Sequence, residues 1–231
     1  MNKLAQTSTP YDLTVMSDVS IDGDSDIAEY LASCDVQMSD YAERMEQISV
    51  YDADMLYADL FQGQTLNLWP IDEPVPEREV AVISISDFNR ALAMQDKEPI
   101  RLGEDEYLWN CNYDGTYQYV SKALNTHPEL TVGGVTLRRA SGELLQETYF
   151  MTSIGNNDRG TLIVPDNVVS TLSKDMNYLL GQFTRNYTQA VKQAADNKRR
   201  YAPGEGSIPP VLLSGVSKGV SPLAHDFACK V

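Results

Sequence analysis

The sequence is poor in the residue types that build most metal sites and covalent catalysts. Its 231 residues include two histidines, His127 and His225, too few for a three-histidine metal centre within one chain. The three cysteines, Cys34, Cys111 and Cys229, are far apart and form no CxxC pair. Neither a zinc site nor a framework of disulfides is therefore indicated, although a single bridge stays open. We expect no metal and no cofactor.

Long apolar runs and nucleotide-binding motifs are also absent from the sequence. No run approaches the roughly 20 apolar residues that cross a bilayer, and no basic leader precedes an apolar segment at the start. There is no P-loop and no GxGxxG pattern, so a nucleotide would have to bind another polypeptide. We expect a unit that folds in water and leaves any use of ATP to a partner.

Basic residues are scarce, because 18 lysines and arginines face 33 aspartates and glutamates, for a net charge of -15. Such a charge repels the phosphate backbone, so nucleic acid is not an expected partner. A cationic ligand is a better match, although acidity that serves only solubility is the commoner case. With 42% hydrophobic residues, the chain can bury a sizeable core of its own.

Strand patterns and helix patterns alternate along the chain. Strands are expected over residues 11–16, 45–51, 80–85, 106–113, 130–137, 144–151, 161–164 and 177–183, and helices from 26, from 86, over 115–124 and over 188–200, with helix or turn over 55–61. Asp26 and Ser86 are the expected N-caps. Gly133 and Gly134 mark a turn or a bulge. These patterns predict an α+β fold with mixed sheets.

Three prolines make residues 69–79 a stiff loop that neither a helix nor a central strand continues easily. The loop is a candidate boundary between two lobes, residues 11–69 and 80–200. A single large domain over residues 11–200 is the alternative that the length also allows. The Pro/Gly-rich tail over 201–231 is expected to be loose and receives no assignment.

Two short patterns resemble functional motifs but stand in the wrong context. Residues 22–26, DGDSD, offer carboxylates for Ca²⁺, yet Ile27 and Ser33 occupy the positions where a calcium loop needs Gly and Glu. Turn formation and helix capping account for this segment better. The GxSxG pattern of residues 215–219 would make Ser217 a nucleophile, but no buried strand precedes it. A secreted serine hydrolase using Ser217 is therefore a remote alternative.

Aromatic residues gather in one short interval, which supplies the candidate ligand-binding residues Tyr107, Trp109, Tyr113, Tyr117 and Tyr119. Rings with polar tips suit a face that recognises peptides or lipid headgroups, because they bury area at low entropic cost. Packing of alternate strand residues into a core accounts for most of these rings equally well. No residue is assigned a catalytic role.

Four segments in a fixed order resemble the large extracellular domain of FtsX-like ABC-transporter permeases of the MacB and BceB type. They are TPYDLTV at 9–15, VISISDFNR at 82–90, EDEYL at 104–108 and GTLIVPDNVV at 160–169. The resemblance covers most of the chain from residue 9 to about 190, and after Pro210 the sequence departs from the family pattern.

This resemblance implies a non-enzymatic module on the extracellular face of the cell membrane of a Gram-positive-type cell. Residues 1–10 and 201–231 would lead to the transmembrane remainder of the permease, which a cytoplasmic ABC ATPase drives. A sensor histidine kinase is a further implied partner, and the implied ligand is an antimicrobial peptide or a lipid-linked cell-wall precursor. The alternative within the family is a mechanical coupling domain that docks a lipoprotein, an adaptor or a cell-wall hydrolase.

Overall fold

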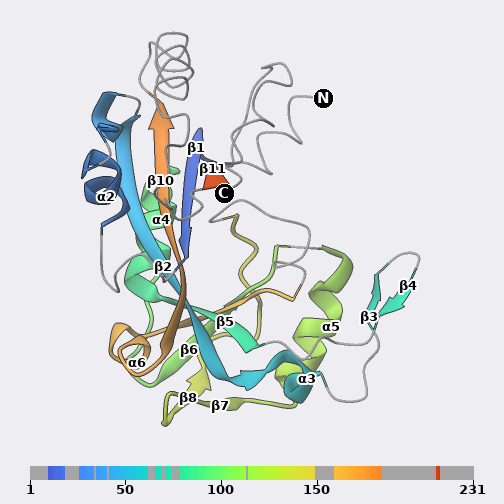
Figure 1. Cartoon of the computed structure of the whole chain (residues 1–231). Helices are drawn as coiled ribbons and strands as arrows, with labels where there is room; N and C mark the ends of the chain where they lie inside the picture. Colours follow the sequence, from blue (N-terminus) through green and yellow to red (C-terminus); the bar gives the residue numbers. More distant parts are fainter. Residues whose placement is uncertain are drawn as a thin grey trace.

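Nine strands form one mixed sheet in the order β11-β1-β10-β2-β5-β9-β6-β8-β7 (Figure 1). The computed structural model describes residues 10–18, 26–33, 35–40, 42–61, 66–68, 71–73, 79–112, 114–148, 159–183 and 212–213. The strands of the sheet are β1 (Leu13–Asp18), β2 (Ala42–Leu56), β5 (Glu79–Ser84), β6 (Glu106–Asn110), β7 (Glu129–Val132), β8 (Val135–Arg139), β9 (Thr161–Val164), β10 (Ser173–Phe183) and β11 (Leu212–Leu213). Parallel and antiparallel pairs occur together with helices, so the predicted α+β fold is confirmed.

Short helices cover both faces of the sheet around β10. They are α2 (Ile27–Ser33), the 3-10 turn η1 (Met38–Asp40) and α4 (Ile85–Ala93). Successive side chains of a strand point to opposite faces, and β10 follows this rule. Leu179 packs with Ile27 and Met38 on one face, whereas Tyr178 and Leu180 pack with α4 on the other. Two separate apolar cores therefore hold this end of the sheet.

The other end of the sheet encloses a larger core, which we call the aromatic core. It is covered by α3 (Tyr57–Leu60), α5 (Asp114–Asn125) and α6 (Asp166–Val169), and its central members are Tyr57, Phe61, Tyr107, Trp109 and Val164. The Tyr57 ring lies 6.3 Å from the Trp109 ring, edge to face, and 6.3 Å from the Phe61 ring, stacked. Burying each such side chain contributes about 1.5–3 kcal/mol, so this core is a main source of stability.

The helix starts follow capping rules, with one correction. Asp26 caps α2 as predicted, since its Oδ1 accepts an amide N–H of the first turn at 2.7 Å. The predicted cap Ser86 is wrong, because α4 begins earlier and Ser84 is its N-cap, with Oγ accepting the N–H of Asp87 at 3.0 Å. Both serines precede the same apolar stripe, so the sequence pattern did not separate them. The Ser86 hydroxyl instead donates to Asp166 at 2.6 Å.

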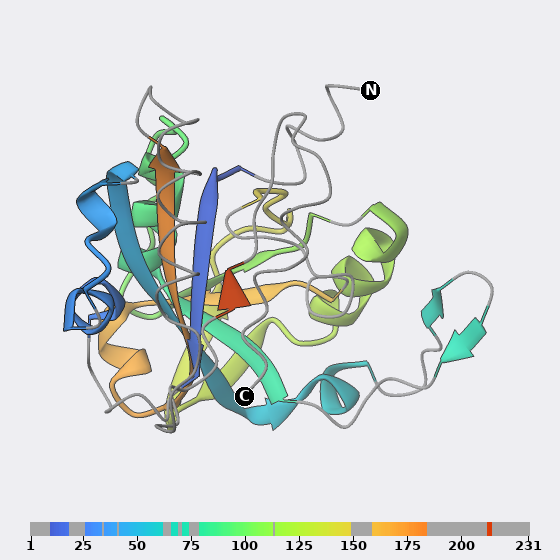
Figure 2. The same ribbon diagram turned by 45° about the horizontal axis from the view of Figure 1, so that its top comes forward.

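One sheet contains strands from both sides of the proline-rich loop. Strand β10 lies between β1 and β2, and β5 pairs with β2, so residues 11–69 and 80–200 contribute to the same sheet. The loop therefore does not divide the sheet into two lobes. Strand β4 (Ile71–Glu73) lies within the loop and pairs with the preceding β3 (Leu66–Leu68) as a hairpin that projects from the sheet and has β3 next to α5 (Figure 2).

The strand predicted over 144–151 is wrong for its described part. Leu145 makes one isolated bridge to Asn110 of β6, and residues 146–148 form no ladder. The backbone groups of Glu147 and Thr148 form hydrogen bonds with the side-chain amides of Asn110 and Gln95, so no partner strand is needed. The predicted turn at Gly133 and Gly134 is confirmed, since their φ values of 57° and 76° suit a two-residue hairpin between β7 and β8.

Several predictions fall outside the described residues. These are the calcium-like segment up to residue 25, the helix over 188–200, the residues Cys34, Cys229 and Ser217, and the tail over 201–231 apart from β11. Strand β11 was not predicted, and it pairs with β1 at Val15 and Met16. No helix in the described part of the chain is long and apolar enough to cross a membrane.

The two most distinctive segments of the sequence, 82–90 and 160–169, are neighbours in the structure. Each is a strand followed by a helix, and β5 and β9 pair in parallel with Ile83 opposite Ile163. The helices that follow are joined because Ser86 donates to the Asp166 carboxylate through its N–H and its hydroxyl. All four residues of β9, Thr161 and three apolar residues, are buried, which is typical of a strand covered on both faces.

Candidate functional site

Tyr107 and Trp109 belong to the aromatic core and not to a binding face, which corrects the expected ligand-binding role. The two side chains are 0% and 1% exposed. The Tyr107 hydroxyl donates to the His127 carbonyl at 2.8 Å, and Trp109 Nε1 donates to the Arg159 carbonyl at 2.9 Å. Neither the rings nor their polar tips are available to a ligand, so the alternative of core packing is the correct one for both.

The remaining candidate tyrosines lie on or next to α5. Tyr117 is half-buried and packs against the aromatic core, and Tyr119 is half-buried on the same helix. Tyr113 lies outside the described residues. The four described aromatic residues therefore do not form one surface, because β6 directs its two rings inward while α5 carries the half-buried Tyr117 and Tyr119.

The chain around Gly160 is held by the tips of two buried rings. The Tyr57 hydroxyl donates to the Gly160 carbonyl at 2.7 Å, next to the bond from Trp109 to Arg159. Gly160 has φ of 84°, and a Cβ at this position would lie 2.3 Å from the Asn110 carbonyl oxygen. Only glycine fits such a conformation and such a close approach. The arrangement positions β9 against β6.

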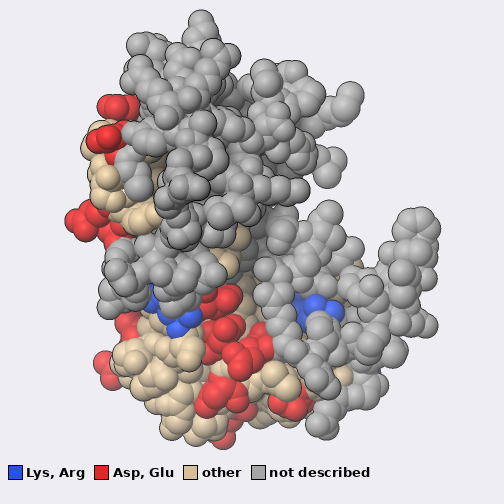
Figure 3. Space-filling view, viewed as in Figure 1, with Lys and Arg blue, Asp and Glu red and all other residues tan. Residues whose placement is uncertain are grey.

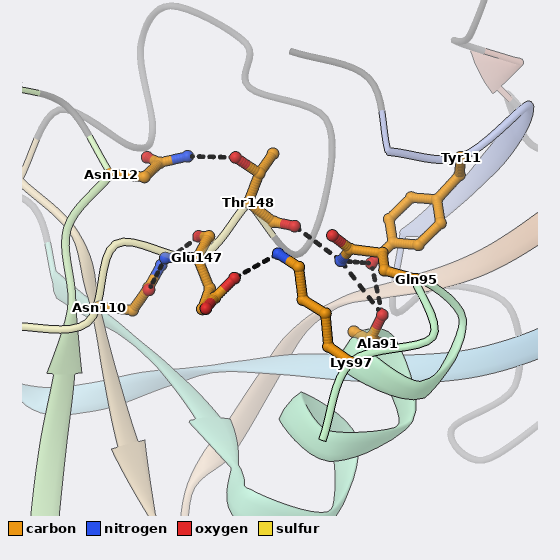
Figure 4. A network of polar contacts seen from close by, with 8 residues as sticks. All are labelled: Tyr11, Ala91, Gln95, Lys97, Asn110, Asn112, Glu147 and Thr148. Atoms are coloured by element: carbon orange, nitrogen blue, oxygen red, sulfur yellow. Dashed lines mark hydrogen bonds and ion pairs between the residues drawn. The ribbon is translucent and has the colours of Figure 1, made fainter. Parts of the chain in front are cut away.

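A network of amides holds residues 145–148 beside β6 and α4 (Figure 4). Asn110 and the backbone of Glu147 exchange two hydrogen bonds, each of 2.8 Å. Gln95 Nε2 donates to the Thr148 carbonyl at 2.7 Å and to the Tyr11 hydroxyl at 3.2 Å. These bonds replace the strand ladder that the sequence predicted, and sequence reasoning missed them because their members are far apart along the chain.

The network also reaches the start of β1. The Tyr11 hydroxyl donates to the Ala91 carbonyl of α4 at 3.1 Å, and burial raises the pKa of this tyrosine well above its usual range. At the opposite end, Lys97 forms an ion pair with Glu147 near solvent. The groups are mostly neutral amides and hydroxyls, and their hydrogen bonds fix the positions of β1, α4 and residues 145–148.

A buried carboxylate lies where β5 turns into α4. Asp87 is 4% exposed, and its Oδ2 accepts the backbone N–H of Ser49 at 3.0 Å. The ladder between β2 and β5 begins at Val50, the residue after Ser49. Asp87 therefore supplies the hydrogen-bond acceptor that a longer β5 would have supplied to Ser49. Arg90 pairs with the same carboxylate. The Ser49 hydroxyl donates to Asn177 of β10 at 2.7 Å, which ties three elements together.

Carboxylates gather on the solvent face of the sheet over β2 and β5 (Figure 3). Ala53 of β2 points into the aromatic core, so the adjacent Asp52 and Asp54 point to the other face. Asp54 and Glu79 are exposed. In the described ranges no three His, Cys, Asp or Glu side chains come together closely enough to hold a metal ion. This face offers negative charge to a ligand.

No family model matches this chain, and no curated protein matches it. Its function is therefore inferred from its residues and from their arrangement.

Proposed function

We propose that the chain is a non-catalytic extracellular domain of an FtsX-like ABC-transporter permease. In this role it binds a peptide antibiotic or a lipid-linked cell-wall precursor and couples the bound state to the transporter. The observation that carries the proposal is that β1 begins where β10 ends. The Asp12 N–H donates to the Gly181 carbonyl at 3.1 Å, and the Phe183 N–H donates to the Asp12 carboxylate at 3.1 Å.

This adjacency suits a domain inserted between two segments of a longer chain. The chain enters the sheet at residue 12, β10 ends beside it at residue 183, and β11 returns to pair with β1 at Val15 and Met16. The first and the last described strands are therefore neighbours. Units with neighbouring ends are inserted into other proteins without distorting either partner. A domain placed between two membrane-spanning segments needs this geometry, which supports the role that the sequence resemblance implies.

The charge of the solvent face over β2 and β5 favours a cationic ligand. Asp54 and Glu79 are exposed on it, and the whole chain carries a net charge of -15. Complementary charge raises association rates and selects among partners. A ligand changes the state of the transporter only by its differential affinity for two arrangements of the domain. The paired start of β1 and end of β10 is where such a difference would reach the flanking segments.

Calorimetric titration of the full chain with a cationic peptide antibiotic, at low and at high salt, tests the proposal. We expect saturable binding that weakens with salt. The double variant Asp54→Asn with Glu79→Gln should weaken binding about threefold to tenfold, the effect of one or two exposed ion pairs. The matched control Glu104→Gln with Asp105→Asn removes two exposed carboxylates elsewhere and should change little. Absence of binding to both the peptide and a lipid-linked precursor would contradict the proposal.

A mechanical coupling role is the second candidate, and the projecting hairpin β3–β4 favours it. A hairpin that stands away from the sheet offers edges to which another protein can add. Chemical crosslinking in producing cells, with and without residues 66–73, distinguishes the two roles. A protein partner that is lost with the hairpin, together with no ligand binding, would favour coupling. The remote hydrolase alternative is contradicted if Ser217→Ala leaves any esterase activity unchanged.

A further inference from the structure

Arg139 is held at the rim of the aromatic core by neutral groups. It ends β8 two residues after the buried Leu137, so its side chain starts on the inner side of the strand. Its Nη1 donates to Asn125 Oδ1 at 2.9 Å, and its Nη2 donates to the Gly142 carbonyl at 2.8 Å. These two bonds fix the guanidinium plane without neutralising its charge.

The neighbouring Arg138 shows the opposite arrangement. It points to the outer side of β8 and pairs with the carboxylates of Asp105 at 3.3 Å and Glu106 at 3.7 Å. In the part of the chain that the structure describes, no such carboxylate pairs with Arg139.

A hollow of about 250 Å³ opens beside the Arg139 guanidinium. Its lining residues are Leu124, Asn125, Pro128, Arg139, Ser141 and Gly142. Pro128 is exposed and supplies an apolar wall, whereas Leu124 is fully buried in the aromatic core. The backbone of Gly142 together with Asn125 holds the guanidinium in place. The hollow thus combines an oriented cation with space for a small apolar group.

The phenol of Tyr107, which lies opposite Arg139 in the pair of strands β6 and β8, does not neutralise the charge of that arginine. Burial raises the pKa of the Tyr107 phenol to about 12, although the positive charge of Arg139 by itself lowers that pKa. The phenol is therefore neutral at physiological pH. Just after α5, the His127 ring nitrogen bonds the Ala123 carbonyl. The exposed Glu143 directly follows Gly142, and its N–H donates to the Ser141 hydroxyl.

We propose that this hollow binds a carboxylate that carries a small apolar group, such as the C-terminal residue of a peptide. Arginine has five N–H donors, of which Arg139 uses two, and the planar fork matches a carboxylate in bidentate geometry. The volume is below the roughly 300–1,000 Å³ of ordinary ligand pockets, so it suits a single residue. The exposed ring of Pro128 receives the apolar group.

A phosphate dianion fits the hollow less well. One guanidinium balances one negative charge, and the carbonyls at the C-terminal end of α5 add negative potential nearby. The negative net charge of the chain also disfavours binding of a dianion. A monoanion is therefore the preferred ligand, and the site is independent of the proposed transporter role.

Titration of the isotope-labelled full chain with N-acetylalanine, followed by amide chemical shifts, tests the site. We expect saturable shifts at Ser141 and Gly142. N-acetylalaninamide has the same shape without the charge and should bind about tenfold more weakly or not at all, because charged hydrogen bonds contribute more than neutral ones. Equal binding of the amide, or tighter binding of inorganic phosphate than of N-acetylalanine, overturns the proposal.

Two neighbouring variants separate the site from general electrostatics. Arg139→Gln should weaken binding of N-acetylalanine about tenfold or more, whereas Arg138→Gln removes the same charge from the other side of β8 and should leave binding unchanged. Similar affinities for both variants overturn the proposal. If circular dichroism shows that Arg139→Gln is unfolded, Arg139→Lys decides instead. It keeps the charge but loses the fork, so several-fold weaker binding supports the site and unchanged binding overturns it.

Discussion

The aromatic core and the core beneath α4 are equally well buried, but they are joined to their surroundings in different ways. In the aromatic core, Tyr57, Tyr107 and Trp109 each donate one hydrogen bond to a backbone carbonyl. Beneath α4, the joining groups are the side chains of Tyr11 and Asp87, which contact backbone groups of other elements. The first core depends on ring volume, and the second depends on matched polar groups.

This difference shows how one sheet is stabilised by two kinds of contact. Removing volume from the aromatic core costs transfer free energy and leaves a cavity. Removing one polar partner near α4 leaves a buried donor or acceptor unsatisfied. Strands β1 and β10, which are far apart in sequence, pair in the half of the sheet covered by α4. The hydrogen bonds of polar side chains there therefore help to set the register between the two strands. The comparison leads to four predictions.

Trp109→Ala should have the largest effect, because it removes the largest fully buried side chain of the aromatic core. We expect a loss of about 3–5 kcal/mol in the free energy of unfolding, measured by urea denaturation. Tyr119→Ala on α5 is the control and should cost less than about 1 kcal/mol. A small loss for Trp109→Ala would show that ring volume does not dominate this core.

Gly160→Ala tests whether the same core depends on close backbone approach. The added Cβ would meet the Asn110 carbonyl oxygen at 2.3 Å with φ of 84°, so backbone and neighbour would both have to move. We expect a loss of about 2–4 kcal/mol by urea denaturation. Gly134→Ala also has positive φ but meets nothing within 4 Å, and it should cost only about 1 kcal/mol. Equal losses would mean that the conformation alone matters.

Asp87→Ala tests the polar joint near α4. It leaves the Ser49 N–H without its carboxylate acceptor in a buried position, so we expect a loss of about 1–3 kcal/mol of stability in thermal or urea unfolding. Asp105→Ala removes an exposed carboxylate paired with Arg138 and should cost less than about 1 kcal/mol. If both variants lose the same small amount, the polar joint is not what stabilises the α4 half.

The smallest expected effect is a pH dependence from Tyr107. Its pKa is raised from 10.0 to about 12 by burial, so the folded state keeps the phenol proton where the unfolded state releases it. The resulting stability is complete below the unfolded pKa and is lost as pH rises through the folded pKa. From about pH 9 to about pH 11 we expect a loss of about 1 kcal/mol that Tyr107→Phe lacks. An equal pH slope in both proteins would contradict the assignment.

The sequence pattern could not predict which side chains of the candidate site are buried. Tyr107 and Trp109 stand two residues apart, which fits one face of a half-buried strand as well as a core. Four consecutive residues of β6 are buried, so alternation carries no information on which ring faces solvent. Arg139 and Arg138 are adjacent in sequence and similar in chemistry, and only the side of β8 on which each lies separates a paired charge from an unpaired one.

The sequence by itself determined most strands and helices, the cap at Asp26, the hairpin turn at Gly133 and the strong negative charge. These features depend on periodicity, on side-chain bonds to nearby backbone and on composition, all of which are local. The tertiary structure alone decided that β10 lies between β1 and β2, that Ser84 caps α4 and that Asp87 completes the β2 ladder. Those choices depend on contacts between residues far apart in the chain, where the free energy of burial and hydrogen bonding outweighs local preference.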